Sequence, residues 1–316
     1  MIRENERLAV EATMKNAGVY DLLYDNDLTE IMANPDGKLW VDRLGKGREF
    51  TGIIIPAEKR EAVIITCASY CGELCHKKLP LLEADLIDFG YARFQGVLPP
   101  VTHAPAFSIR RKAILNYSLD ELSEAKGMLT KDHVYIIRAA VIEKKNILIA
   151  GGTNTGKTTF ANAILKEFAD NERVITLEDT MELETSIIKD CFPLRTMNGT
   201  VTMDTLLRTA LRLRPDRILL GEVRGKEAWS LLKALSSGHS GGLCTIHAFG
   251  GKSALTRLEQ LALEASIKQI PKDLIGEVID IIVHIEFDAK SGIRKIADIT
   301  KVHGFDGKEY IVEKVG

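Results

Sequence analysis

Short runs of apolar residues, separated by polar turns, fill the first third of the chain. Their lengths and the Pro and Gly residues that flank them predict a mixture of short helices and strands. The predicted elements are a helix at 28–32, turns at 34–37 and 42–46, a strand at 38–41, a helix at 60–77, and strands at 85–94, 95–99 and 107–111. We interpret residues 1–117 as a smaller α+β domain that has no catalytic motif of its own.

The segment from Ser118 to Glu121 predicts the start of a second domain. It fits a capping box, in which the Ser118 hydroxyl and the Glu121 carboxylate satisfy the first backbone N–H groups of a helix. We therefore place the domain boundary just before Ser118 and assign residues 118–316 to the second domain. Another helix, at about 132–144, leads directly into the next apolar strand.

Beyond this boundary an order of apolar strand, polar tip and helix repeats, which is typical of an α/β domain with a mostly parallel sheet. The predicted strands are 146–150, 173–177, 217–220 and 243–246, and a helix at 160–168 follows the first of them. Three later segments, 278–287, 295–302 and 309–313, are predicted to form an antiparallel meander. Ligands bind at the carboxyl ends of parallel strands, so the polar tips are expected to converge on one crevice.

The first of these tips is a glycine-rich segment with the pattern G-x-x-x-x-G-K-[ST]. A strand before it and a helix after it make this pattern specific for phosphate binding. Its glycines allow the backbone to wrap around a phosphate beside the positive end of the helix. Lys157 is predicted to reach the β- and γ-phosphates, and the Thr158 hydroxyl to ligate Mg²⁺. The residues predicted to hold the nucleotide are Gly151, Gly152, Thr153, Asn154, Thr155, Gly156, Lys157, Thr158 and Thr159.

Carboxylates occupy the tips of two further strands, where they could hold a metal's water shell or orient an attacking water. They are Glu178, Asp179, Glu182 and Glu222. We favour Glu222 for activating water and Glu182 for the metal, so that Thr158 and Glu182 are the predicted metal residues. A purely structural role for each carboxylate stays open. Many phosphate-loop enzymes carry Asp just before the catalytic Glu, but here that position is Gly221.

His247 follows the strand at 243–246 and is predicted to sense the γ-phosphate from within the crevice. His239 lies on the other side of a Gly-rich turn, and the simpler interpretation is that it has a structural role. Arg212, Arg214 and Arg224 are expected around the same crevice, where they could pair with phosphate or serve as ion-paired structure or a subunit contact. The predicted catalytic residues are thus Lys157, Glu182, Glu222 and His247.

Composition restricts the partners of the chain. Its 316 residues are 45% hydrophobic and 27% charged, with a formal net charge of −2. A chain without overall basicity is not expected to bind nucleic acid directly, although Arg110-Arg111-Lys112 forms a short basic run. We find no apolar stretch of the roughly 20 residues that a spanning helix needs, and the N-terminus is charged. We therefore expect a cytoplasmic protein that contacts a membrane peripherally, if at all.

Cys67, Cys71 and Cys75 recur at helical spacing and are expected on one face of the helix at 60–77, with His76 beside them. The spacing matches neither zinc ribbons nor ferredoxins. A packed helix face is the favoured interpretation, and a metal or redox site is the alternative.

Four blocks together resemble the type II/IV secretion ATPases. The blocks are GGTNTGKTT, LEDTMEL, RPDRILLGEVRG and SSGHSGGLCTIHA, which are similar in order and spacing to the Walker A, Asp, Walker B and His boxes of that family. Segments 28–34, 94–100 and 107–111 resemble its VirB11-like branch.

The resemblance implies a homo-hexamer in which RecA-like C-terminal domains form one ring and PAS-like N-terminal domains another, with ATP bound between the two domains. It places Arg93 and Arg110 on the nucleotide phosphates, and Glu182, Glu222 and His247 in the Asp, Walker B and His boxes. It implies work on pilus biogenesis or substrate translocation, with inner-membrane subunits of a conjugation or secretion channel as partners. The four-cysteine module and the long N-terminal extension of the type II secretion ATPases are not expected.

Three alternatives stay open. The first is a pilus ATPase of the tight-adherence or type IV pilus type, with the same chemistry on different partners. The second is a non-hydrolysing assembly scaffold that binds nucleotide as a structural ligand. The third, a nucleotide kinase, is disfavoured because no acceptor-binding lid is predicted between Phe168 and Arg217.

Overall fold

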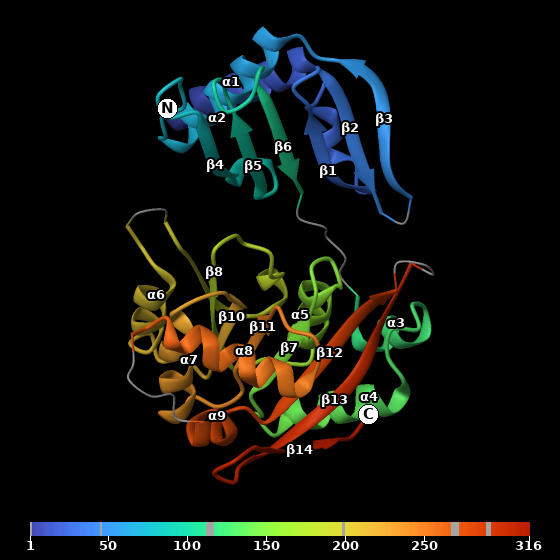
Figure 1. The fold of residues 1–316 in the computed structure, drawn as a ribbon, viewed down its shortest axis with the longest axis vertical. Coiled ribbons are helices and arrows are strands. Elements are labelled where there is room, and N and C mark those ends of the chain that lie inside the picture. The colour runs from blue at the N-terminus through green and yellow to red at the C-terminus, as the bar shows by residue number, and fades with distance from the viewer. Residues whose placement is uncertain (1, 45, 112–116, 198–199, 267–271, 289–291) are drawn as a thin grey trace. The chain divides into compact units, whose positions relative to one another are not determined.

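A computed structural model of the chain describes residues 2–44, 46–111, 117–197, 200–266, 272–288 and 292–316 (Figure 1). The chain divides into two compact units, residues 1–114 and 115–316, which we call unit 1 and unit 2. Their boundary falls close to the one expected before Ser118, and residues 112–116 lie outside the described part.

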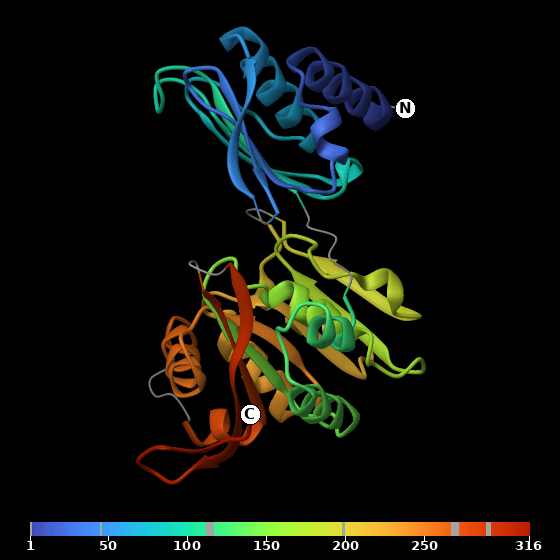
Figure 2. The ribbon, with the colours of Figure 1, turned by 90° about the vertical axis from the view of Figure 1, so that its right-hand side faces the viewer.

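The described residues of unit 1 form a six-stranded antiparallel sheet in the order β3-β2-β1-β6-β5-β4. Two helices lie on the same side of this sheet (Figure 2). The elements are α1 (Ile2–Ala17), β1 (Leu28–Ala33), β2 (Lys38–Arg43), β3 (Gly47–Ile54), α2 (Ala57–Cys71), β4 (Leu81–Leu86), β5 (Ala92–Val97) and β6 (Ala106–Arg110), with 3₁₀ turns η1 (Asp21–Tyr24) and η2 (Ile87–Phe89).

The core of unit 1 lies between the sheet and the two helices. Val10 and Met14 of α1 and Val63 and Ile64 of α2 are fully buried there. From the sheet, Phe94 contributes a ring that stacks on a neighbouring aromatic ring with 5.5 Å between centroids. This apolar contact fixes which face of each strand points inward, so the alternate residues lie on the open face of the sheet.

The prediction of a helix at 28–32 is wrong, because these residues form β1. Leu28, Ile31 and Ala33 are buried in a strand that pairs with β2 on one side and β6 on the other. A run of five residues is too short for its spacing to separate a helix from a central strand. The turn at 34–37 is confirmed, with the Gly37 N–H donating to the Asn34 carbonyl at 2.9 Å.

Other boundaries in unit 1 also differ from the prediction. Helix α2 ends at Cys71 because Gly72 adopts a left-handed conformation (φ +71°) and caps it. The strand predicted at 85–94 is divided into β4 and β5 by η2 and by Gly90 (φ +72°). Helix α1 and strand β3 were not predicted.

The cysteine prediction is wrong in one respect, because Cys75 lies beyond the end of α2 and shares no helix face with the other two. Cys67 and Cys75 are buried and Cys71 is half-buried. Burial raises the pKa of the Cys67 thiol. In the part of the chain that the structure describes, no group of three His, Cys, Asp or Glu side chains is arranged to hold a metal ion.

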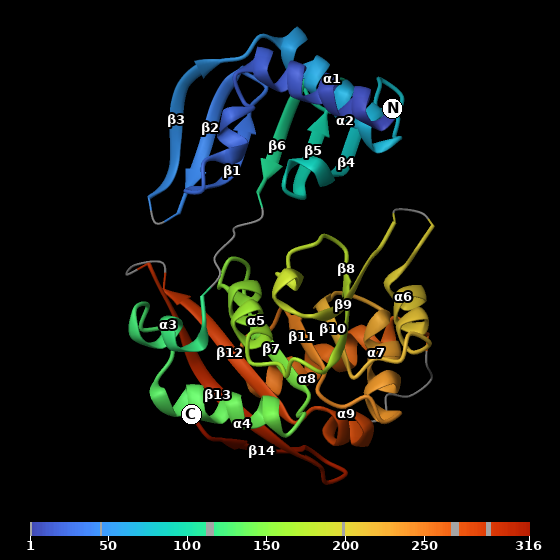
Figure 3. The ribbon, with the colours of Figure 1, turned by 180° about the vertical axis from the view of Figure 1, so that it is seen from behind.

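Unit 2 contains, in its described residues, an eight-stranded sheet in the order β14-β13-β12-β7-β11-β10-β8-β9 (Figures 1 and 3). Its strands are β7 (Ile147–Gly151), β8 (Arg173–Glu178), β9 (Asp190–Arg195), β10 (Arg217–Val223), β11 (Leu243–Ile246), β12 (Ile281–Asp288), β13 (Ile293–Phe305) and β14 (Tyr310–Lys314). Its helices are α3 (Leu119–Glu124), α4 (Lys131–Ile142), α5 (Lys157–Leu165), α6 (Met203–Ala210), α7 (Glu227–Ser236), α8 (Gly251–Leu263) and α9 (Lys272–Val278), with the 3₁₀ turn η3 (Thr185–Ile187).

The predicted parallel sheet is present, and the successive pairs from β12 through β7, β11, β10 and β8 to β9 are all parallel. The predicted meander is confirmed, because β13 pairs antiparallel with β12 on one side and with β14 on the other. The parallel pairing of β12 with β7, which joins the meander to the central sheet, was not predicted. Strand β9 and helix α6, in the interval 168–217, were not predicted.

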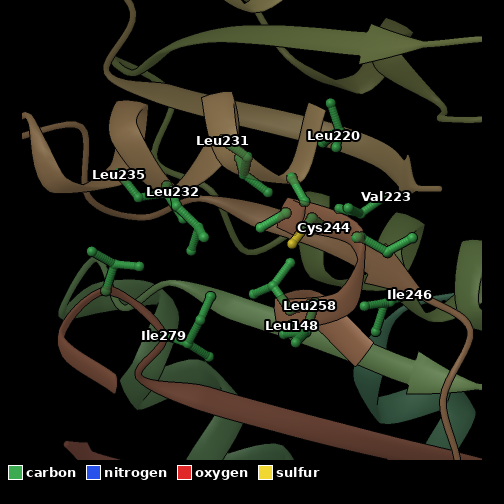
Figure 4. Close-up of a cluster of buried hydrophobic side chains, with 14 of the residues drawn as sticks. Leu148, Leu220, Val223, Leu231, Leu232, Leu235, Cys244, Ile246, Leu258 and Ile279 are labelled. Carbon is green, nitrogen blue, oxygen red and sulfur yellow. The ribbon is translucent and has the colours of Figure 1, made fainter. Parts of the chain in front are cut away.

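Helices cover both faces of this sheet. α3, α4 and α5 pack on one face and α6 to α9 on the other (Figure 3). On the second face Leu231, Leu232 and Leu235 of α7 pack against Leu148 of β7 and Cys244 of β11 (Figure 4). Each buried leucine stabilises the fold by ~2 kcal/mol. The predicted capping box at Ser118 is confirmed, with the Glu121 N–H donating to the Ser118 hydroxyl at 3.1 Å.

No helix among the described residues is both long and apolar enough to cross a membrane.

Candidate functional site

The predicted phosphate loop joins β7 to α5, as expected. Gly151 is the last residue of β7, and a Cβ there would lie 2.6 Å from the Thr155 hydroxyl and 2.7 Å from the Ile285 carbonyl oxygen. Asn154 (φ +61°) and Gly156 (φ +95°) both adopt left-handed conformations. The chain therefore turns too tightly here for most side chains, which explains the glycines in the motif.

This loop fits the phosphates of a nucleotide. Gly156 is the N-cap of α5 and has no side chain to accept from the helix. The first hydrogen bond of the helix runs from the Phe160 N–H to the Gly156 carbonyl, so the N–H groups of residues 157–159 have no acceptor within the helix. Together with the helix dipole, these groups form a site that favours an anion.

Lys157, Glu222 and His247 come from three neighbouring elements and lie together. The Lys157 ammonium donates to the carbonyls of Gly151 and Gly152 at 3.0 and 2.7 Å. It lies 3.5 Å from Nδ1 of His247. On its other side, Nε2 of His247 is 2.7 Å from Oε1 of Glu222. These contacts form a continuous chain from the phosphate loop across β11 to β10.

Glu182 reaches the same loop from the segment after β8. Its Oε2 accepts from the Thr158 hydroxyl at 3.0 Å. A hydroxyl and a carboxylate that meet at the start of α5 form a donor set suited to Mg²⁺, which prefers oxygen ligands. The two residues predicted to hold the metal are thus brought together.

Glu178 has a positioning role that its sequence position did not reveal. It is almost completely buried at the end of β8. Its Oε1 accepts from the backbone N–H groups of Glu182 and Leu183 at 2.8 and 2.9 Å. A buried carboxylate that accepts two backbone hydrogen bonds fixes the loop that carries Glu182.

Gly221, where many phosphate-loop enzymes have Asp, is explained by the same carboxylate. A Cβ at position 221 would lie 3.0 Å from Cγ of Glu178 on the neighbouring strand. The Thr245 hydroxyl donates to the Gly221 carbonyl at 2.7 Å and holds β10 in place from the other side. Glu178 therefore fills the space that a larger residue at 221 would need.

Arg224 adds a second charge contact to Glu222. Its guanidinium donates to Oε2 of Glu222 at 2.7 Å and lies 3.5 Å from Oδ2 of Asp179. The Thr196 hydroxyl donates to the other oxygen of Asp179 at 3.1 Å. Glu222 thus lies between the imidazole of His247 and the guanidinium of Arg224.

Burial and neighbouring charges shift the pKa values of Lys157 and His247. Burial lowers the pKa of Lys157, and the nearby carboxylates Glu222 and Glu182 oppose that shift. The pKa of His247 is lowered first by burial and then by the charge of Lys157, while Glu222 acts in the opposite direction. The neutral imidazole is therefore favoured over a wider pH range than in an exposed histidine.

Three of the predicted neighbours lie at the opposite end of the sheet. Arg212 and Arg214 precede β10, and His239 precedes β11, whereas the site lies where these strands end. The prediction that Arg212 and Arg214 surround the crevice is therefore wrong. Arg212 and Arg214 are close to Glu222 in sequence, but most of β10 lies between them. A strand is extended, so residues before it lie far from residues at its end.

Arg93 and Arg110 lie in unit 1, where they are directly opposite each other on β5 and β6. Glu30 of β1 is the next partner of Arg110 in the sheet. A groove of about 230 Å³ runs along this sheet and is lined in part by Glu30, Gln95 and Ser108. The sheet therefore presents the two arginines together on one face.

Sequence reasoning missed Arg294 and Phe287. Arg294 of β13 donates from Nε to the Asn154 carbonyl in the phosphate loop at 3.1 Å. Its guanidinium lies 4.8 Å from the centre of the Phe287 ring. No motif marks either residue, because they reach the loop only through the pairing of β12 with β7.

The chain is similar to a known protein family and to individual members of it. The family model described as "Type II/IV secretion system protein" matches residues 91–290. The conjugal transfer protein TrbB of Rhizobium radiobacter is 42% identical over 294 residues, covering 92% of this chain and 88% of that protein. The type IV secretion system protein PtlH of Bordetella pertussis is 35% identical over 308 residues, with coverages of 86% and 90%.

Solved structures give the same result. The VirB11 ATPase from the Brucella suis type IV secretion system, in complex with sulphate, is 26% identical with a TM-score of 0.51, and the match covers 94% of this chain and 95% of that one. The ATPase DotB of Yersinia pseudotuberculosis has a TM-score of 0.64 at 15% identity, covering 92% and 78%. The second likeness supports the fold alone.

Proposed function

The chain belongs to the type II/IV secretion system protein family, and we propose that the crevice at the end of β7, β8, β10 and β11 is its ATP-hydrolysing site. The protein is an ATPase that powers conjugative transfer or type IV secretion. The observation that carries the site is the unbroken chain of contacts from Lys157 through His247 to Glu222, beside the pair Thr158 and Glu182.

In this site the phosphate loop binds ATP through the N–H groups at the start of α5. Lys157 turns from its two loop carbonyls to the β- and γ-phosphates. Glu222 orients the attacking water and accepts its proton, while Arg224 keeps that carboxylate in place. His247 remains neutral and reports the γ-phosphate to Glu222 through the 2.7 Å contact.

Mg²⁺ is the proposed metal, held by Thr158 and, directly or through water, by Glu182. Bound there, it would neutralise charge on the β- and γ-phosphates during phosphoryl transfer. Glu178 keeps Glu182 within reach of Thr158 through its two backbone hydrogen bonds.

Unit 1 contributes Arg93 and Arg110 to the same nucleotide. Their position opposite each other on β5 and β6 presents a paired positive charge, which matches the phosphates of ATP better than a single arginine would. Loss of the γ-phosphate releases this pair, and the resulting movement of unit 1 is the mechanical output. In this proposal unit 1 is a PAS-like domain and unit 2 a RecA-like domain.

The active form is a homo-hexamer that works in the cytoplasm, peripherally at the inner membrane. Its partners are inner-membrane subunits of the conjugation or secretion channel. Support comes from the family, from the VirB11 relative, and from a net charge of −2 that gives no general attraction to nucleic acid.

The test is Mg²⁺-dependent phosphate release by the purified protein, together with its mass in solution with and without a non-hydrolysable ATP analogue. Lys157→Ala is the control. We expect hydrolysis that the control loses and a ring that the analogue stabilises. A ring without hydrolysis, even with lipid added, would contradict the proposal and favour a nucleotide-binding scaffold.

A further inference from the structure

The β12–β13 hairpin contacts the phosphate loop through the side chain of Arg294. Arg294, exposed near the start of β13, donates from Nε to the Asn154 carbonyl at 3.1 Å. The two residues are 140 positions apart in the chain, so only the fold brings them together. The contact reaches the loop from a strand that carries none of the residues in the proposed chemistry.

We infer that Arg294 is a positioning residue that holds the phosphate loop in its phosphate-binding conformation. A loop that binds phosphate turns its N–H groups inward and its carbonyls outward. In a planar trans peptide the carbonyl and the following N–H point in opposite directions. By holding the Asn154 carbonyl outside, Arg294 therefore directs the Thr155 N–H toward the phosphate. This inference rests on the proposed function, since it requires nucleotide phosphates to bind at this loop.

Gly156 also lies against the Arg294 side chain. A Cβ at position 156 would lie 3.2 Å from Cδ of Arg294. The same residue has φ +95°, which already disfavours a side chain. The glycine therefore both makes the turn and leaves room for the arginine stem beside it.

Phe287 holds the guanidinium in the orientation that the contact needs. It lies directly opposite Arg294 in the pairing of β12 with β13. Its ring centre is 4.8 Å from the guanidinium carbon, which is within the range of a cation–π interaction. A lysine at this position would keep the charge but could not stack as a plane on the ring.

The experiment measures binding of two probes, Mg²⁺-ATP and inorganic tripolyphosphate, by isothermal titration calorimetry. Arg294→Ala should weaken both by about tenfold, because the loop is no longer held in its binding conformation. The kcat at saturating ATP should stay within ~twofold of wild type, so that the loss falls on KM. Arg294→Lys should recover part of the loss for both probes.

Lys295→Ala is the matched control. Lys295 is the next residue on β13 and also exposed, and its side chain points to the other face of the strand. Lys295→Ala removes a charge of the same sign without altering a contact to the loop, so the affinities for Mg²⁺-ATP and tripolyphosphate should not change. Equal losses in Lys295→Ala and Arg294→Ala would overturn the inference and leave only a general charge effect.

Two further results would overturn it. Unchanged affinities in Arg294→Ala would show that the contact does not hold the loop, and a loss confined to ATP would show a contact with the nucleoside instead. If Arg294→Ala does not fold, Phe287→Leu decides, because unchanged affinity for both probes in that variant contradicts the inference. Wild-type protein that binds neither probe would contradict the proposed function itself.

Discussion

Nε2 of His247 lies 2.7 Å from Oε1 of Glu222. The Lys157 ammonium can only donate, so in the neutral imidazole Nδ1, 3.5 Å from it, is the acceptor and the ring proton is on Nε2. The proposed site therefore works with one tautomer of a neutral histidine. Protonation at Nδ1 would place a second positive charge next to Lys157.

This geometry predicts how activity and stability depend on pH. Because the pKa of His247 in the folded protein is lowered from 6.5, hydrolysis should stay constant as pH falls from 8 to about 6.5 and decline only below that value. A lowered pKa in the folded state means that the unfolded chain binds the proton more readily, so stability is lost as pH falls below about 6.5. Urea unfolding of wild type and His247→Gln between pH 5 and 8 measures the difference. A gap between the two that does not change with pH would contradict the prediction.

Glu222 and Glu182 should separate in their dependence on Mg²⁺. Glu222→Gln is expected to lower kcat by ~10²–10⁴-fold at every Mg²⁺ concentration, since it removes the proposed base and keeps the side-chain shape. Glu182→Gln should instead raise the Mg²⁺ concentration needed for half-maximal rate, because Glu182 contacts Thr158 rather than His247. Phosphate release across a Mg²⁺ titration measures both effects, with the exposed Glu286→Gln as control. The reverse result would exchange the two proposed roles.

Gly221→Ala should perturb the site through Glu178. The new Cβ would lie 3.0 Å from Cγ of Glu178, and the buried carboxylate would have to move away from the Glu182 and Leu183 N–H groups. We expect a loss of about 1–3 kcal/mol in the free energy of unfolding, as for other overpacked sites, together with a higher Mg²⁺ requirement. Denaturant unfolding and the Mg²⁺ titration measure the two effects. If stability falls while the Mg²⁺ requirement stays unchanged, Glu178 does not position Glu182.

Arg110→Ala tests whether unit 1 takes part in hydrolysis. Arg110 lies opposite Arg93 on a sheet of unit 1, and its loss should raise KM for ATP and lower turnover without changing the unfolding of unit 2. Arg48→Ala is the control, because Arg48 is an exposed arginine on β3 of the same unit. Steady-state kinetics of both variants give the answer. Wild-type rates in Arg110→Ala would remove unit 1 from the mechanism.

Much of unit 2 could be predicted because its sequence signals are local. A strand, a glycine-rich loop and a helix follow one another without interruption at residues 147–165, and the tips of three further strands carry the polar residues. The rule that ligands bind at the carboxyl ends of parallel strands then brings Glu182, Glu222 and His247 to one place. In the structure Glu182 contacts Thr158, and His247 lies between Lys157 and Glu222, so all three meet the phosphate loop.

What could not be predicted depends on contacts between distant segments. Strand β1 is defined by its pairing with β2 and β6 and by the burial of Ile31, neither of which is visible in a run of five residues. Arg294 reaches Asn154 because β12 pairs in parallel with β7. The sequence predicted β12 as a strand of the meander but did not predict this pairing. Glu178 and Glu182 are both glutamates, so the sequence alone does not distinguish their roles. The burial of Glu178 in the structure indicates a positioning role rather than a catalytic one.

The turn that precedes β11 provides a prediction about stability alone. Arg217, at the start of β10, is 3% exposed and pairs with Glu172 at 2.6 Å. It also donates to the Val141 carbonyl at 2.8 Å, and a Cβ at Gly241 would lie 2.7 Å from one of its terminal nitrogens. The guanidinium thus occupies the space beside Gly241, at the end of the sheet away from the nucleotide.

Arg217→Met should therefore reduce the free energy of unfolding by about 3 kcal/mol, because it leaves the buried Glu172 carboxylate with Lys144 as its remaining partner. This loss of stability should leave the KM for ATP unchanged at temperatures where the variant is folded, because Arg217 lies at the opposite end of β10 from Glu222. Denaturant unfolding and steady-state kinetics on the same preparation measure both quantities. A variant that is as stable as wild type but has an altered KM would mean that the glycine-rich turn acts on the nucleotide rather than on the packing of β11.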